Sequence, residues 1–122
     1  MIFNGSDNAI LIPFNNLIHD DFTFTCWFYK TSIGSKNYQT LLGGPSGFEL
    51  EARNSSGTEP QIVPWNWGKN LATYNFNEWT FVAFTRDINQ TLLYVNGEYK
   101  TTGTAGTLPT GNYYIGAWNT ST

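Results

Sequence analysis

The sequence predicts an all-β fold, a sandwich of two antiparallel sheets. Side chains alternate with a period of two along nearly every apolar segment, which is the period of a β-strand. Turn-forming pairs such as Gly43-Gly44 and Asn96-Gly97 separate these segments. No apolar stripe with helical spacing extends beyond two turns. The 122 residues suit one domain, residues 1–122, with no room for a second.

The expected strands are short and follow one another along the whole chain. They are Ala9–Pro13, Phe22–Tyr29, Tyr38–Gly43, Phe48–Arg53, Gln61–Trp65, Trp79–Arg86, Leu92–Asn96, Glu98–Thr101 and Asn112–Ala117. Asn96-Gly97 gives the clearest hairpin signal, because a type I′ turn needs φ > 0 at both positions. Two strands, those that contain Trp27 and Trp79, are apolar on both faces, as expected of inner strands in a packed sandwich. We therefore expect Trp27 and Trp79 to be structural.

Composition excludes two classes of partner. Charged residues make up 12% of the chain and the net charge is −3, without any cluster of Lys and Arg. A phosphate backbone requires a basic stripe, so nucleic acid is excluded. No apolar stretch approaches the roughly 20 residues of a membrane span, so we expect no membrane insertion. Strand-like sequence begins at Ile2, which predicts that no signal peptide precedes the fold.

Five segments carry a family resemblance. They are Phe3–Pro13, Asp21–Phe28, Glu78–Arg86, Leu92–Glu98 and Tyr113–Ala117. In this order and at this spacing, the chain resembles laminin G-like domains of the concanavalin A-like lectin and glucanase superfamily. The resemblance implies a jelly-roll sandwich with a curved face that often binds a ligand.

One part of the family pattern is not found. The family usually closes with a further strand that pairs near the first strand, whereas this sequence ends at Trp118–Thr122. We therefore expect the final strand to be missing, truncated or supplied by another chain. An uncovered sheet edge beside Ile10 and Ile12 predicts an oligomer or a partner that adds a strand there.

The aromatic group after the fifth expected strand is the candidate ligand site. Trp65, Asn66 and Trp67 follow Pro64, and Tyr74 lies shortly after. Proline favours an edge or loop position, which would leave the rings near the surface. Exposed flat rings beside Asn and Thr donors suit stacking on a sugar. Two interpretations stay open: these residues form a sugar platform, or they pack inside the sandwich or against a partner chain.

Glu49 and Glu51 are candidate catalytic acids, because they share one face of a strand and the superfamily contains glucanases. The glucanase pattern E-x-D-x-x-E is absent, and Arg53 occupies the place where a third acid would help. A polar strand face with a Glu–Arg pair explains the same residues. We predict that the chain is not an enzyme.

The remaining reactive residues favour structural roles. His19 is the sole histidine, and Cys26, the sole cysteine, suits a small buried hydrophobic position. Asp7, Asp20 and Asp21 could bind Ca²⁺, with Asp7 as the metal candidate, but capping of loop turns explains them as well. We expect no cofactor, with calcium as the alternative.

Three functions are consistent with these features. Our first prediction is a non-catalytic attachment module of a virion, such as a phage structural, decoration or adhesin domain, that contacts host glycan or a neighbouring subunit. The alternative is a carbohydrate-binding module cut from a secreted bacterial enzyme or adhesin. A glucanase-type glycoside hydrolase is the third. The first two place the protein outside the cell or on a virion surface, with a glycan or a protein subunit as partner.

Overall fold

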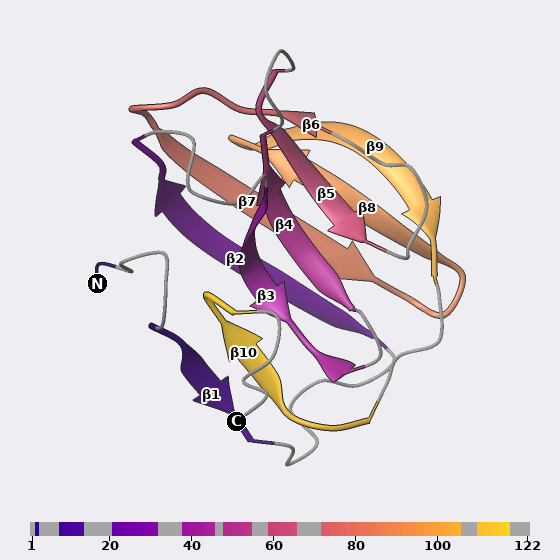
Figure 1. Cartoon of the computed structure of the whole chain (residues 1–122). Helices are drawn as coiled ribbons and strands as arrows, with labels where there is room; N and C mark the ends of the chain where they lie inside the picture. Colours follow the sequence, from indigo (N-terminus) through magenta and orange to yellow (C-terminus); the bar gives the residue numbers. More distant parts are fainter. Residues whose placement is uncertain are drawn as a thin grey trace.

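The computed structural model describes residues 2, 8–13, 21–31, 38–45, 48–54, 59–65, 72–105 and 110–117. These ranges contain ten β-strands and no α-helix (Figure 1). The strands are β1 (Ile10–Ile12), β2 (Phe22–Tyr29), β3 (Tyr38–Gly43), β4 (Glu49–Arg53), β5 (Gln61–Trp65), β6 (Ala72–Thr73), β7 (Trp79–Arg86), β8 (Gln90–Val95), β9 (Glu98–Thr104) and β10 (Tyr113–Ile115). No helix in the described ranges is long and apolar enough to cross a membrane.

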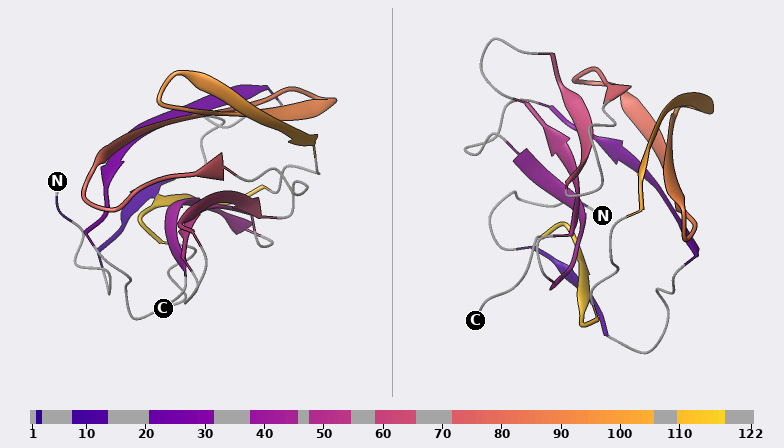
Figure 2. Two further views of the ribbon diagram at one scale, coloured as in Figure 1. Left: turned by 90° about the horizontal axis from the view of Figure 1, so that it is seen from above. Right: turned by 90° about the vertical axis from the view of Figure 1, so that its right-hand side faces the viewer.

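The strands form two antiparallel sheets that lie one on the other. The six-stranded sheet has the order β1-β10-β3-β4-β5-β6, and the four-stranded sheet has the order β2-β7-β8-β9. Figure 2 shows the two layers edge-on. The predicted all-β sandwich of two antiparallel sheets is therefore confirmed. The two-residue strand β6 has no counterpart among the expected strands.

The core forms where the inner faces of the two sheets meet. Alternate residues of β7 and β8, including Val82, Phe84 and Leu93, point inward and have no exposed surface. Leu50 and Ile62 meet them from the six-stranded sheet and are equally buried. Burying a side chain of this size stabilises the fold by about 1.5–3 kcal/mol.

Strand β2 is two-faced. Phe22, Phe24, Cys26 and Phe28 pack against the core, whereas the residues between them point to solvent. Cys26 is a free, partly buried cysteine, and burial raises the pKa of its thiol to about 11. This agrees with the predicted role as a small apolar side chain.

The predicted core role of Trp27 and Trp79 is wrong. Both lie on the outer face of the four-stranded sheet, and they are 63% and 64% exposed. A strand that is covered on both sides has apolar residues on both faces. A strand whose outer face carries exposed rings shows the same sequence pattern, so the pattern does not distinguish the two. Because no second layer covers this face in the described chain, the tryptophans reach the surface.

The β8–β9 hairpin has the predicted geometry. Asn96 has a φ of 52° and Gly97 a φ of 82°, so both turn residues occupy the left-handed region. Asn96 Oδ1 also accepts a hydrogen bond from the Phe81 backbone N–H at 2.9 Å, which ties the turn to β7. The turn thereby fixes the register of β8 on β7.

The first strand pairs within the chain. Ile10, Leu11 and Ile12 of β1 are opposite Ile115, Tyr114 and Tyr113 of β10, and Ile12 packs against the core. On its other side, β1 has no partner among the described strands. Residues 14–20 and 118–122 lie outside the described residues, so strand addition at this edge stays a prediction.

Candidate functional site

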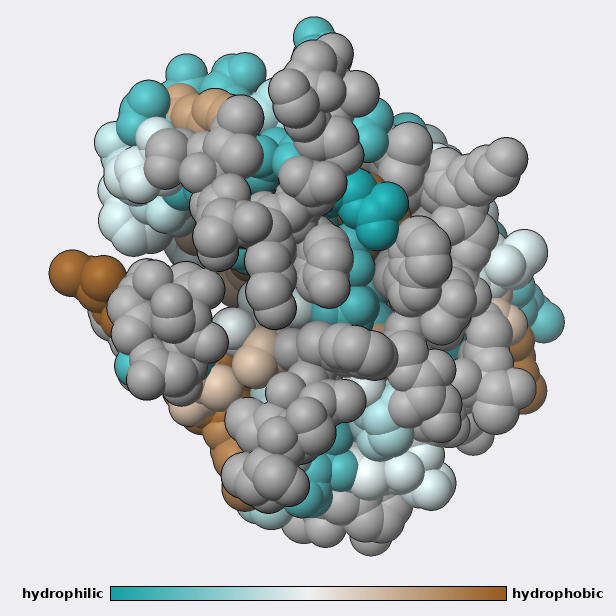
Figure 3. All heavy atoms as spheres, viewed as in Figure 1, coloured by the Kyte–Doolittle hydropathy of each residue, from teal (hydrophilic) through white to brown (hydrophobic). Residues whose placement is uncertain are grey.

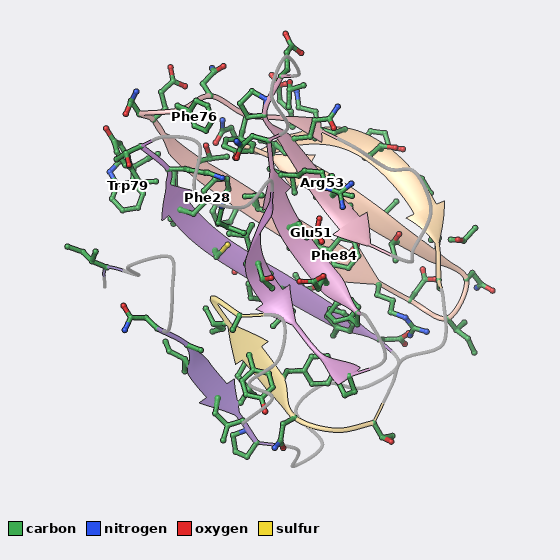
Figure 4. The ribbon with its side chains drawn as sticks, in the orientation of Figure 1. Phe28, Glu51, Arg53, Phe76, Trp79 and Phe84 are labelled. Atoms are coloured by element: carbon green, nitrogen blue, oxygen red, sulfur yellow. The ribbon has the colours of Figure 1, made fainter. Side chains whose placement is uncertain are left out.

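A charged cluster lies on the outer face of the six-stranded sheet. In β4, Leu50 and Ala52 point into the core, so the alternation places Glu49, Glu51 and Arg53 on the opposite face. Figure 4 shows Glu51 and Arg53 side by side over β4 and β5. In Figure 3, hydrophilic residues reach the surface over the same two strands. Charge is therefore concentrated in the middle of this face.

Hydrogen bonds connect the members of this carboxyl cluster, which consists of Thr40, Glu49, Glu51 and Arg53. The Thr40 hydroxyl donates to Glu49 Oε1 at 2.6 Å. Arg53 donates to Glu51 Oε2 through Nε at 3.0 Å and through Nη2 at 2.8 Å. A hydrogen bond also joins the carboxyl groups of Glu49 and Glu51. The four side chains thus form a continuous chain from β3 to the end of β4.

Both carboxyl groups are buried, although they lie on an outer face. Glu49 is 5% exposed and Glu51 is 3% exposed, while the Arg53 side chain is 31% exposed. Burial raises the pKa of Glu49 to about 7. The Thr40 hydrogen bond and the Arg53 charge act against this rise, and the neighbouring Glu51 adds to it. Glu49 therefore holds its proton up to about neutral pH.

Strand register places further residues in a row beside the cluster. Directly opposed residues share a face of the sheet, and Glu49 is opposite Gly43 on β3 and Trp65 on β5. Gly43 is in turn opposite Tyr114 on β10, which is opposite Leu11 on β1. Neighbouring strands lie about 4.8 Å apart, so the distance from Tyr114 to Trp65 across the sheet is roughly 14 Å. This row is long enough for a short oligosaccharide.

The predicted ligand residues fall partly outside the described residues. The Trp65 backbone lies in β5, and its side chain is not described. Asn66 and Trp67 lie outside the described residues altogether, as do Asp7 and His19.

Tyr74 is placed in the core rather than on the outer face. It is 5% exposed, and its ring packs edge-on against Phe28 at 5.1 Å and Phe76 at 6.1 Å. Burial raises the pKa of the Tyr74 hydroxyl to about 12, and this hydroxyl has no hydrogen-bond partner among the described residues. These contacts favour the packing interpretation for Tyr74.

Two members of the site were not identified from the sequence. Thr40 belongs to the cluster only because β3 pairs with β4, and Tyr114 enters the row only because β10 lies next to β3. The available signal was the spacing of Glu49, Glu51 and Arg53 in a chain that is only 12% charged. That spacing correctly predicted the Glu–Arg pair, which the structure shows between Glu51 and Arg53.

The carboxyl groups of the cluster are bonded to other protein side chains. Retaining enzymes hold two carboxyl groups about 5–5.5 Å apart with the sugar between them. In this chain Glu49 and Glu51 contact each other, and each carboxyl group also accepts a hydrogen bond from a protein side chain, Thr40 or Arg53. The described residues contain no group of three or more His, Cys, Asp and Glu side chains that could hold a metal ion.

Comparison with known proteins agrees with this architecture. A family model described as "Concanavalin A-like lectin/glucanases superfamily" matches residues 4–122. Among curated proteins, no sequence matches significantly. One similar solved structure is domain 4 of AbnA, a GH43 extracellular arabinanase from Geobacillus stearothermophilus, in complex with arabinotriose. The two chains are 21% identical with a TM-score of 0.66, and the likeness covers 93% of this chain and 59% of that one.

At this identity the structural likeness shows the fold alone, whereas the family match extends over nearly the whole sequence. The resemblance of five sequence segments to laminin G-like domains indicates the same superfamily. The chain belongs to the concanavalin A-like lectin/glucanases superfamily.

Proposed function

We propose that this domain binds a carbohydrate without cleaving it, on the outer face of the six-stranded sheet around the carboxyl cluster. The observation that carries this proposal is the buried pair Glu49–Glu51, held by Thr40 and Arg53 on a face that does not contribute to the core. Burying carboxyl groups costs stability unless they are paired. Clusters of this kind with a strongly shifted pKa occur preferentially at functional sites.

The chemistry of the cluster suits sugar hydroxyls. The buried carboxyl groups hold Arg53 in position, and the guanidinium of Arg53 presents several N–H donors in a fixed plane. The salt bridge to Glu51 holds that plane in place, and the Arg53 side chain is exposed enough to contact a ligand. Tyr114 shares the row with Glu49, so its ring would stack on the sugar while Arg53 orients it. Trp65, Asn66 and Trp67 remain predicted ligand-binding residues.

The comparison with AbnA supports a glycan as the ligand, because that solved domain holds arabinotriose and comes from an extracellular arabinanase. We therefore propose an extracellular carbohydrate-binding module, and arabinose-containing oligosaccharides are the first ligands to test. The other prediction, an attachment module of a virion, draws no support from the family match or from AbnA. It stays a prediction.

The affinity for arabinotriose, measured by calorimetry, tests this proposal. Arg53→Lys keeps the charge but loses the planar fork of donors, so we expect binding to weaken about tenfold, or ~1.4 kcal/mol. The matched control is Lys100→Arg, which alters the exposed Glu98–Lys100 pair on β9 and should leave binding unchanged. Equal effects of both substitutions, or no binding of arabinose, xylose and glucose oligosaccharides by the wild-type protein, would contradict the proposal.

The absence of catalysis is tested separately. Incubation with arabinan and with β-glucan should release no reducing sugar, because both carboxyl groups are buried and already bonded to protein side chains. Turnover that disappears in Glu49→Gln would show instead that the cluster is an active site.

A further inference from the structure

The outer face of the four-stranded sheet carries a set of exposed and partly exposed aromatic rings. We call this set the aromatic face. Its members are Trp27 and Tyr29 on β2, Trp79 and Phe81 on β7, Tyr94 on β8 and Tyr99 on β9. Trp27, Trp79 and Tyr99 are each more than half exposed, and Tyr29 is 46% exposed. Figure 4 shows Trp79 at the margin of the molecule, turned away from the core residues Phe28 and Phe84.

These rings form pairs across the strands instead of packing into the core. Trp27 and Phe81 are directly opposed, with ring centroids 5.1 Å apart, and Tyr29 and Trp79 are 5.5 Å apart. Tyr94 and Tyr99 form a third pair at 5.8 Å. Such pairing holds each ring in a fixed orientation, so little side-chain freedom remains to be lost on binding. A surface of this kind is already arranged for a ligand.

The chemistry of the aromatic face points to a neutral, hydroxyl-rich ligand. Strands β2 and β7 present no charged side chain here: their outward residues are Thr23, Thr25, Trp27 and Tyr29 on β2, and Trp79, Phe81, Ala83 and Thr85 on β7. A surface for an anionic polymer would need basic side chains, which β2 and β7 do not present here. Rings beside threonine and tyrosine hydroxyls offer stacking for the C–H faces of sugars and hydrogen bonds for their hydroxyl groups.

We propose that the aromatic face is a second carbohydrate-binding surface, which takes the extended chains of a neutral polysaccharide. It lies on the opposite side of the sandwich from the carboxyl cluster, because the two sheets turn their outer faces away from each other (Figure 2). The two surfaces can therefore be occupied at the same time. A continuous sheet face offers an open platform instead of a closed pocket, which suits a long chain or the surface of an insoluble polymer. The proposal goes beyond the binding site around Arg53 and does not depend on it.

The test is a binding isotherm on insoluble cellulose and insoluble arabinan, with polygalacturonate as an acidic probe. The double variant Trp27→Ala/Trp79→Ala should bind a neutral polymer at least tenfold more weakly than wild type. The matched control is Ile88→Ala, which removes a side chain that is 72% exposed but lies outside the aromatic face. It should bind as wild type does, and polygalacturonate should not be retained.

Several outcomes would overturn the proposal. They are wild-type affinity in the double variant, equal losses in Ile88→Ala, and no binding of either neutral polymer by the wild-type protein. The oligomeric state in solution provides a further test. If the wild-type protein is a dimer, and the double variant is a monomer with unchanged polysaccharide binding, this face is a contact between copies of the chain. Loss of polymer binding in Arg53→Lys alone would place all sugar binding at the carboxyl cluster. Conversely, failure of arabinotriose to bind would leave this proposal standing.

Discussion

The two outer faces of this sandwich differ in which side chains they bury and which they expose. The face of the six-stranded sheet holds two buried carboxyl groups, which are kept in place by Thr40 and Arg53. The face of the four-stranded sheet exposes large rings such as Trp27 and Trp79 to water. Neither arrangement helps folding, since buried charge and exposed apolar surface both cost free energy. The inner faces provide the stability, which leaves the outer faces available for binding.

The same contrast holds for two salt bridges of equal length. Glu51–Arg53 and Glu98–Lys100 each join residues two apart in a strand, with a shortest N–O distance of 2.8 Å. Glu51 is 3% exposed, whereas Glu98 is 75% exposed. An ion pair in water contributes little to stability, but the loss of one partner from a buried pair leaves an uncompensated charge. The contribution of each ion pair to the free energy of unfolding should therefore depend on its burial and not on its N–O distance.

On the two outer faces, the largest expected effect is that of removing Arg53. Arg53→Ala leaves Glu51 buried beside Glu49 without its cation, and the free energy of unfolding at pH 8 should fall by about 3 kcal/mol. Urea denaturation followed by tryptophan fluorescence measures this change. The control, Lys100→Ala, should leave the midpoint unchanged, because its partner Glu98 is exposed. Similar midpoints for both variants would show that the buried pair has no special energetic role.

A pH dependence of similar size should come from Glu49. Its pKa is about 7 in the folded protein, compared with 4.5 for the free side chain. Between these values the folded state holds a proton that the unfolded state has lost, so stability is greatest below about pH 4.5 and falls as the pH rises through 7. From pH 5 to pH 8 this single group should reduce the free energy of unfolding by about 2–3 kcal/mol.

Denaturation curves of wild type and Glu49→Gln across this pH range check the prediction. The variant keeps a side chain of the same size but cannot ionise, so its stability should change much less between pH 5 and pH 8. A wild-type protein that becomes more stable over this range, or an unchanged slope in the variant, would remove Glu49 as the cause.

The smallest effect on stability should come from the aromatic face. Trp27→Ala and Trp79→Ala remove rings that are 63% and 64% exposed, so each should lower the free energy of unfolding by less than about 1 kcal/mol. By contrast, Phe84→Ala on the inner face of the same strand as Trp79 should cost about 3–5 kcal/mol, because Phe84 is fully buried. Losses of similar size at Trp79 and Phe84 would mean that the outer rings are structural after all.

The sequence could predict those features of the fold that depend on the local order of apolar and polar residues. A period of two predicted the strands and the sandwich, and the Asn96-Gly97 pair predicted the hairpin turn, because these depend on local residue order. It could not tell which face of β2 and β7 is inside, since both faces are apolar, and Trp27 and Trp79 were therefore assigned to the wrong environment.

The site was harder to predict than the fold. The spacing of Glu49, Glu51 and Arg53 identified a shared face and an ion pair within one strand. The contributions of Thr40 and Tyr114 come from strand pairing between β3, β4 and β10, which connects residues far apart in the chain. Burial of the carboxyl groups, which shifts the pKa of Glu49, depends likewise on the assembled sheet.

The most direct test of the proposed binding face is an NMR titration of ¹⁵N-labelled protein with arabinotriose. If the ligand binds at the carboxyl cluster, the backbone amides of Thr40, Glu49, Glu51, Arg53 and Trp65 should shift in a saturable manner, and those of Thr25 and Thr85 on the opposite sheet should not. The Arg53→Lys variant should show the same pattern with a weaker apparent affinity. Saturable shifts confined to β2 and β7, or no saturable shifts with arabinose, xylose and glucose oligosaccharides, would contradict the assignment of this face as the binding site.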